Sequence, residues 1–261
     1  MRKIFLLVWM FALLGASGAL RAQTDLIRDR SEKQRLAAEL AASRAVQQVL
    51  IPEEIPTVPG FRIRAVYKPF GEVGGDFFQI IPLSDGGALI AIGDVSGKGM
   101  PAAMLVSLLV GALHALAKAT AKPAQLLAGL NQSVQGRSLG GFTTCLALHI
   151  EAGDAMTFAN AGHISPYRNG MELSCENGLP LGLVAESDYR ESTLQLGLGD
   201  QVTLLTDGVL EARSEKGKLF GFERTAKLSS KKAEEIAAAA QDFGQEDDIT
   251  VLTVARLAVT A

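Results

Sequence analysis

The sequence predicts an α+β fold in which one β-sheet packs on another and helices cover the outside. Short β-like runs follow one another and are separated by turn signals such as Asp85-Gly86-Gly87 and Gly153-Asp154. The helical segments, by contrast, come in blocks rather than alternating singly with the strands. Hydrophobic residues make up 48% of the 261 residues, which is ample for the core of one domain. The net charge of −3 gives no indication of a nucleic-acid partner.

Residues 1–22 are expected to be a signal peptide or a membrane anchor. Met1-Arg2-Lys3 is followed by an uncharged apolar run over residues 4–20, which ends in small residues. This pattern is typical of a signal peptide cleaved after Ala19 or Ala22, but the run is also just long enough to span a bilayer. For an anchor, the basic residues that follow favour a cytoplasmic domain by the positive-inside rule. The sequence thus predicts a protein that is membrane-associated or exported, and it leaves the side of the membrane open.

Residues 25–51 are expected to form a helical linker. The stretch from Asp25 to Leu50 contains no Gly or Pro and is rich in Ala, Glu, Arg, Gln and Leu. Its heptad seam is only half apolar, which fits either a weak coiled coil, through which the chain could form a homodimer, or a helix docked on the domain. Prolines then end the helix, and the compact domain is expected over residues 57–257.

The elements of this domain are predicted from short β-like runs for the strands and from longer Ala- and Leu-rich runs for the helices. In chain order, strands are expected at Phe61–Tyr67, Phe77–Leu83, Ala88–Val95, Thr143–Ile150, Met156–Asn160, Pro166–Tyr167, Ser192–Leu196, Gln201–Thr206 and Ile249–Ala255. Helices are expected at Pro101–Lys118, Pro123–Gln135 and Lys232–Ala240.

The chemistry is predicted at acidic residues beside strand ends. Asp94 and Asp207 each close an apolar run, whereas Asp76 and the pair Asp247-Asp248 each precede one. A single aspartate of this kind is usually a turn residue, but these positions could converge on one rim of the fold. Because close carboxylates repel one another in a partly dry site, such a cluster is stable only around a cation. Ligands that are all oxygen select Mg²⁺ or Mn²⁺ rather than zinc.

A glycine-rich turn, Gly93-Asp94-Val95-Ser96-Gly97-Lys98-Gly99, joins a predicted strand to a predicted helix. Its glycines allow the backbone to approach a ligand closely. The turn is not the phosphate-binding loop of nucleotide-dependent enzymes, because Gly99 stands where Ser or Thr is required and Ile92 where the first Gly is required. Cysteine phosphatases are excluded as well, since neither Cys145 nor Cys175 begins a Cys-x5-Arg signature.

Five motifs occur together along the compact domain. They are Gly74-Gly75-Asp76-Phe77-Phe78, the glycine-rich turn at residues 93–99, Asn160-Ala161-Gly162-His163-x-x-Pro166, Thr206-Asp207-Gly208 and Asp247-Asp248-Ile249-Thr250. In this order and spacing the chain resembles the metal-dependent PPM-type serine/threonine phosphatases of the bacterial SpoIIE/RsbU-like branch, roughly from Pro59 to Arg256. The resemblance implies a PPM-like αββα fold, a sandwich of two antiparallel sheets flanked by helices, with a two-metal site at one edge.

The resemblance also implies the ligands of two Mn²⁺ or Mg²⁺ ions. They are Asp76, Asp94, the backbone carbonyl of Val95, Asp207 and Asp247, with Asp248 as a second choice. A water activated by the metals would attack the phosphorus of phosphoserine or phosphothreonine without a covalent enzyme intermediate. Lys98 could neutralise the phosphate or donate a proton, and its alternative interpretation is an exposed lysine of the turn.

The function implied by this resemblance is that of a phosphoprotein phosphatase in bacterial signal transduction. Its substrate would be a phosphorylated protein, in this branch an anti-sigma-factor antagonist. The alternative is a catalytically silent PPM-fold module that serves as a binding scaffold, although all the candidate metal aspartates are present. A kinase or nucleotide hydrolase is disfavoured by the failed phosphate-loop pattern.

Overall fold

A computed structural model of the chain describes residues 28–38, 41–42, 50–71, 74–137 and 141–257. The chain divides into two compact units, residues 1–42 and residues 43–261, and each is considered by itself. In the first unit, residues 28–38 are helical and exposed. The helical linker over residues 25–51 stays a prediction. Nothing in the described part of the linker supports a coiled coil, and a homodimer through residues 25–51 stays a prediction.

The localisation predicted from the sequence needs correction. Within the ranges that the structure describes, no helix is both long and apolar enough to cross a membrane. The prediction of a membrane-associated or exported protein is therefore wrong on this finding. The run over residues 4–20, on which that prediction rested, lies outside the described residues.

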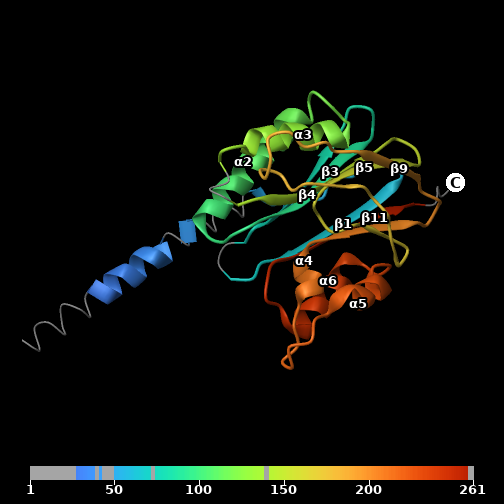
Figure 1. Cartoon of the computed structure of the whole chain (residues 1–261). Helices are drawn as coiled ribbons and strands as arrows, with labels where there is room; N and C mark the ends of the chain where they lie inside the picture. The colour runs from blue at the N-terminus through green and yellow to red at the C-terminus, as the bar shows by residue number, and fades with distance from the viewer. Residues whose placement is uncertain (1–27, 39–40, 43–49, 72–73, 138–140, 258–261) are drawn as a thin grey trace, which may run out of the picture. The chain divides into compact units, whose positions relative to one another are not determined.

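Two β-sheets form the centre of the second unit (Figure 1). The first sheet has the order β1 (Phe61–Lys68), β11 (Ile249–Arg256), β10 (Gln201–Leu205), β6 (Tyr167–Arg168) and β7 (Met171–Glu172). The second has the order β2 (Asp76–Pro82), β3 (Ala88–Val95), β4 (Thr143–Ile150), β5 (Ala155–Ala161) and β8 (Asn177–Gly178), and β9 (Glu191–Gln195) also pairs with β5. All neighbouring strands are antiparallel except β5 and β8.

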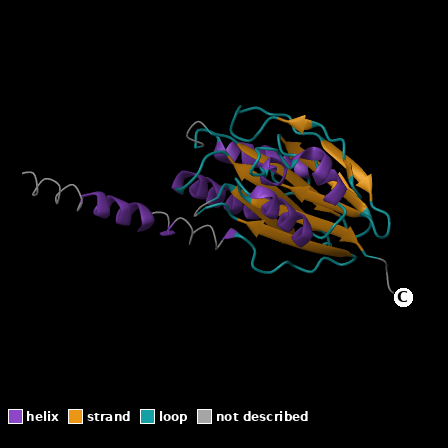
Figure 2. Cartoon of the chain, turned by 90° about the horizontal axis from the view of Figure 1, so that it is seen from below, coloured by secondary structure: helices purple, strands orange, loops and turns teal. Residues whose placement is uncertain are grey.

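Helices cover the outer face of each sheet, as Figure 2 shows from below. The second sheet is covered by α2 (Met100–Leu116) and α3 (Pro123–Val134). The first sheet is covered by α4 (Asp207–Glu211), α5 (Gly221–Leu228) and α6 (Ala233–Gly244). The order of layers is therefore helix, sheet, sheet, helix, which confirms the predicted αββα sandwich.

The alternation of side chains along β3 shows why this sequence forms a central strand. Leu89 and Ala91 point into the core layer shared with α2 and α3. Ile90 and Ile92 point to the other side, into the layer between the two sheets. Because successive side chains of a strand face opposite sides, a strand that is buried on both faces reads as one continuous apolar run.

All the strands and helices predicted for this domain are present, with ends that differ by four residues or fewer. The elements that the sequence did not predict are the two-residue strands β7 and β8 and the short helices α4 and α5. A two-residue strand has no period to detect, and α5 begins at a glycine and has a single buried residue. These elements form because tertiary contacts hold them.

Replacing Leu148 with Ala should lower the free energy of unfolding by about 2–5 kcal/mol, because Leu148 is fully buried between the sheets. The matched control is Leu198→Ala, since Leu198 is 61% exposed. We expect that variant to change the free energy of unfolding by less than about 0.5 kcal/mol. Urea unfolding followed by circular dichroism measures both, and equal losses would contradict the layered core.

Candidate metal centre

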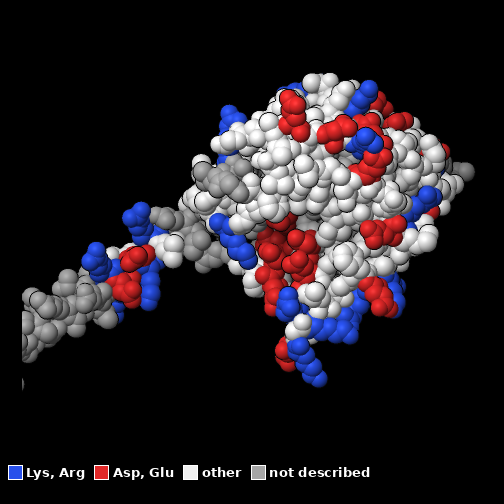
Figure 3. All heavy atoms as spheres, viewed as in Figure 1, with Lys and Arg blue, Asp and Glu red and all other residues white. Residues whose placement is uncertain are grey.

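The predicted aspartates come together at one rim of the sandwich. The register of β2 and β3 places Asp76 directly opposite Asp94 in the second sheet. In the first sheet, Asp207 follows β10, and Asp247 precedes the neighbouring strand β11. The two sheets therefore deliver their acidic residues to the same edge, and Figure 3 shows acidic atoms lining a hollow there.

Asp76 is the most deeply buried carboxylate of the group, with 1% exposure. Its Oδ2 accepts hydrogen bonds from the hydroxyls of Thr206, at 2.7 Å, and Thr250, at 2.5 Å. Burial first, and then the charges of Asp94 and Asp248, raise the pKa of Asp76 well above its ordinary value, although the two threonines oppose the shift. Neither threonine was predicted as a site residue, although each belongs to one of the five motifs, Thr206-Asp207-Gly208 and Asp247-Asp248-Ile249-Thr250.

Asp94 lies at the centre of the acidic group. Burial and then the charges of Asp207, Asp247, Asp248 and Glu211, in that order, raise the pKa of Asp94 to about 7. Burial raises the pKa of Asp207 too, and the charges of Glu211 and Asp247 add to this effect. These carboxylates therefore destabilise one another's charged forms, and any nearby positive charge would relieve the repulsion.

The glycines before Asp76 allow this crowding. A Cβ at Gly75 would lie 2.4 Å from the carbonyl oxygen of Val95 and 2.6 Å from Oδ1 of Asp94. A Cβ at Gly74 would lie 1.6 Å from Oδ2 of Asp248. The backbone can pass between these oxygens only without a side chain. Val95, whose carbonyl is one of the predicted ligands, lines the same cleft as Asp94, Asp247 and Asp248.

The structure separates the roles of the adjacent Asp247 and Asp248. Asp248 is 3% exposed, and its Oδ1 accepts a hydrogen bond of 2.7 Å from the backbone N–H of Phe70. Asp247 keeps half of its side chain exposed, and its Oδ1 accepts the backbone N–H of Asp248 at 2.9 Å. Asp248 therefore fixes the loop before β2, and Asp247 is the more open to a ligand.

A cleft of about 150 Å³ lies over this group. Its lining residues are Phe70, Gly74, Gly75, Asp94, Val95, Ser96, Gly97, Lys98, Asp247 and Asp248. Among these lining residues Lys98 is the one cation, and its Nζ lies 3.9 Å from Oδ1 of Asp247 and 5.7 Å from the centroid of the Phe70 ring. Phe70 was not predicted as a site residue, because nothing in its local sequence signals the contact.

The chemistry of these donors fits hard divalent cations. The candidate ligands are carboxylate and carbonyl oxygens, as Mg²⁺ and Mn²⁺ prefer, and the carboxylates already raise one another's pKa. Across the residues that the structure describes, no three His, Cys, Asp or Glu side chains are close enough together to hold one ion. Since like charges repel, a cation would have to draw these side chains closer than they stand.

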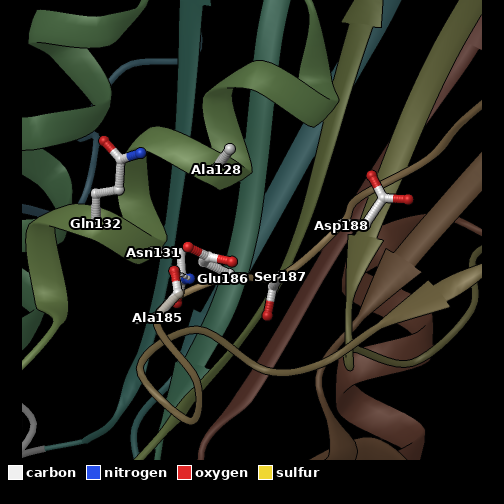
Figure 4. Close-up of a pocket in the computed structure, with 7 residues that line it drawn as sticks. All are labelled: Ala128, Asn131, Gln132, Ala185, Glu186, Ser187 and Asp188. Carbon is white, nitrogen blue, oxygen red and sulfur yellow. Dashed lines mark hydrogen bonds between the residues drawn. The ribbon is translucent and has the colours of Figure 1, made fainter.

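A second hollow, of about 420 Å³, lies between α3 and the segment that precedes β9 (Figure 4). Its most buried polar residue, Asn131, is held in place by protein groups. The amide of Asn131 donates to the carbonyls of Val184 and Ala185, and its oxygen accepts the N–H of Gly182. The amide of Asn131 is thus satisfied within the protein, and the acidic cleft, which gathers several carboxylates, is the better candidate for chemistry.

Comparisons with known proteins agree with this geometry. The sequence model of the SpoIIE family, described as Stage II sporulation protein E (SpoIIE), matches residues 84–257. Phosphoserine phosphatase RsbU of Bacillus subtilis (strain 168) is 28% identical over 244 residues, which cover 87% of this chain and 72% of RsbU. The solved SiaA-PP2C domain of Pseudomonas aeruginosa aligns with a TM-score of 0.74 and 26% identity over 85% of this chain and 97% of that chain. The phosphatase domain of SpoIIE from Bacillus subtilis shares the fold, with a TM-score of 0.55 and 20% identity over 77% of this chain and 95% of that chain.

In chelator-treated protein, Asp94→Asn should stabilise the fold at pH 8 by about 1–3 kcal/mol and have little effect at pH 4. The unfolded carboxyl releases its proton near 3.8, whereas the folded pKa is about 7. The folded state therefore binds more protons between these values, so the wild type loses stability as the pH rises through this window. Thermal unfolding at several pH values measures the difference. Asp242→Asn, on the exposed side of α6, is the control, and a stability gain that is independent of pH would contradict the argument.

Proposed function

Since the chain belongs to the SpoIIE family of PPM-type protein serine/threonine phosphatases, we propose that it removes phosphate from phosphoserine or phosphothreonine with two divalent cations, Mn²⁺ or Mg²⁺. The observation that carries this proposal is the convergence of Asp76, Asp94 and Asp207 from both sheets on one rim. A fold tolerates such a concentration of negative charge when a cation compensates it.

The ligands that we propose come from four segments of the chain. They are Asp76, Asp94, the carbonyl of Val95, Asp207 and Asp247, with Asp248 as the second choice. When bound, the cations would lower the pKa of a water molecule and stabilise the charge of the reacting phosphate. The contacts of Asp248 with Phe70 and Asp76 support its place behind the ligands rather than among them.

We propose that Lys98 binds the phosphate of the substrate. It lies in a turn where Gly97 and Gly99 have φ angles of 102° and 76°, values that suit glycine and fix the path of the backbone. Its Nζ lies near the ring of Phe70 and the carboxylate of Asp247, and all three residues line the cleft. A phosphate dianion that enters an otherwise acidic cleft would gain a charge-assisted hydrogen bond there.

The substrate that we propose is a phosphorylated regulatory protein, such as an anti-sigma-factor antagonist. The relative RsbU is a phosphoserine phosphatase, which supports phosphoserine as the reacting group.

The full chain should hydrolyse p-nitrophenyl phosphate in the presence of Mn²⁺, and Asp94→Asn should lower kcat by at least about 100-fold. The charges of four other carboxylates act on Asp94, so its loss should disrupt the proposed cation site. Asp242→Asn should retain the wild-type rate, as its side chain lies outside the cleft. Absence of turnover with Mn²⁺, Mg²⁺ and other divalent ions would overturn the proposal and favour the silent binding module.

Lys98→Ala should raise KM for p-nitrophenyl phosphate by about 3- to 10-fold and weaken inhibition by inorganic phosphate by a similar factor. We expect a smaller change in kcat. Lys98→Arg should partly restore KM and inhibition by phosphate, because both depend on the positive charge at this position. The control is Lys118→Ala, an exposed lysine just beyond the end of α2. Unchanged inhibition by phosphate in Lys98→Ala would show that Lys98 is only a lysine of the turn.

A further inference from the structure

A strongly basic stretch lies beside the acidic cleft. Residues 213–232, which we call the basic shelf, contain seven Lys or Arg and two Glu, a net charge of +5 in a chain whose total is −3. The shelf consists of a hairpin closed by the pairing of Arg213 with Leu219, then α5, and then the turn before α6. All its cations except the partly buried Arg224 are exposed.

The hairpin of the basic shelf is anchored to both segments that carry candidate ligands. It starts directly after α4, the helix that begins at Asp207. Arg213 donates its backbone N–H to the carbonyl of Gly244, at 2.6 Å, and pairs through Nε with Glu246, at 3.0 Å. Glu246 immediately precedes Asp247, so the shelf adjoins the rim of the cleft. Figure 1 shows this hairpin as the orange loop below α4, and Figure 3 shows basic atoms gathered below the acidic hollow.

The basic shelf also exposes two large apolar side chains to solvent. Leu219 is 44% exposed and Phe222, in the first turn of α5, is 64% exposed. The neighbouring Phe220 is buried and packs edge-on against Phe243, with ring centroids 5.3 Å apart. Phe220 thus holds the hairpin in place, whereas Phe222 faces solvent among cations. An apolar centre with a charged rim is the usual composition of a protein-binding surface.

Most of the positive charge of the basic shelf is available to a partner. Lys227 pairs with Glu223, and Arg213 pairs with Glu246. Over the described residues, no ion pair involves Lys216 or Lys218, which lie at the tip of the hairpin. A field of one sign with exposed charges attracts a partner of the opposite sign at distances of about 10 Å at moderate salt.

We propose that the basic shelf is the docking surface for the phosphoprotein substrate, which would present an acidic surface with an apolar residue close to its phosphorylated serine or threonine. This inference rests on the proposed function. A phosphorylated segment is itself anionic, and it must approach a cleft lined by carboxylates. The shelf offsets that repulsion and orients the partner, so that the phosphorylated residue reaches Lys98 while flanking acidic residues meet Lys216 and Lys218.

The position of the basic shelf favours this partner over a membrane or a second copy of the chain. A flat anionic bilayer seated on the shelf would also face the carboxylates of the adjoining rim, whereas a folded protein can place its acidic residues on the shelf alone. Phe222 and Leu219 provide apolar contact of the size of one or two side chains, which is little for a stable dimer. Binding to vesicles and self-association are therefore outcomes that the test must separate.

The test compares two synthetic phosphoserine peptides of equal length, one flanked by glutamates and a leucine, the other with glutamine in place of each glutamate. We expect the Mn²⁺-loaded full chain to prefer the acidic peptide by about 10-fold in kcat/KM at low salt. The double variant Lys216→Glu/Lys218→Glu should lose this preference and retain wild-type hydrolysis of p-nitrophenyl phosphate. Phe222→Ala should raise KM for both peptides, since both carry the leucine.

The matched control is Lys118→Glu/Lys122→Glu, which makes the same change in charge on exposed lysines between α2 and α3. It should keep the preference for the acidic peptide. The preference of the wild type should fade between about 0.01 M and about 1 M salt, as the screening length falls from about 30 to about 3 Å. Fluorescence anisotropy with the labelled acidic peptide reports docking without turnover, so a failure of the proposed hydrolysis would be distinguishable from a failure of the shelf.

Three results would overturn the docking proposal. The first is equal kcat/KM and equal binding of the two peptides by the wild type. The second is an equal loss of peptide and p-nitrophenyl phosphate hydrolysis in Lys216→Glu/Lys218→Glu. The third is that this variant differs from the wild type in binding to phosphatidylglycerol vesicles, or in mass by light scattering, without a change in peptide preference.

Discussion

The arrangement of the rim depends on one buried carboxylate at the junction of the two sheets. Asp76 belongs to β2 of one sheet, and its Oδ2 accepts hydrogen bonds from Thr206 and Thr250, at the ends of neighbouring strands of the other. A buried carboxylate is costly unless hydrogen bonds or positive charge compensate it. The two hydroxyls do so only in part, because the pKa of Asp76 remains well above its ordinary value. The same contact that joins the sheets thus leaves uncompensated negative charge at the rim, which supports the proposed cation site.

The residues around Asp76 allow several carboxylates to lie close together at the rim. The backbone of Gly74 and Gly75 passes against the carboxylates of Asp248 and Asp94, where no side chain would fit. The carboxylate of Asp248 accepts a hydrogen bond from the backbone N–H of Phe70, and the ammonium group of Lys98 lies over the Phe70 ring. A chain of contacts therefore connects the buried aspartates to the one cation that lines the cleft. These contacts fix Asp248 and Phe70, whereas the side chain of Asp247 stays half exposed to solvent.

Charge of both signs is organised around this rim, although the chain as a whole carries only −3. The cleft gathers carboxylates from both sheets, and the basic shelf, residues 213–232, carries +5 beside it. The two surfaces adjoin because the hairpin after α4 is bonded to the segment that leads into Asp247. The total charge of the chain conceals this separation, so the basic shelf was not predicted from it. The proposed cation site and the proposed docking surface for an acidic protein would therefore lie next to each other, as a phosphatase that selects protein substrates requires.

The sequence by itself determined the order of the elements and the candidate ligands. β3 was predicted correctly because a strand buried on both faces must be apolar throughout, and the aspartates were found because each belongs to a short motif. Tertiary structure alone decided which residues support them. Thr206 and Thr250 lie 130 and 174 residues from Asp76 in the chain, and Phe70 lies 178 residues from Asp248. It also separated the open Asp247 from the buried Asp248 and placed the basic shelf beside the cleft. The physical reason is that local sequence sets periodicity and turns, whereas burial and charge interaction depend on which distant segments meet.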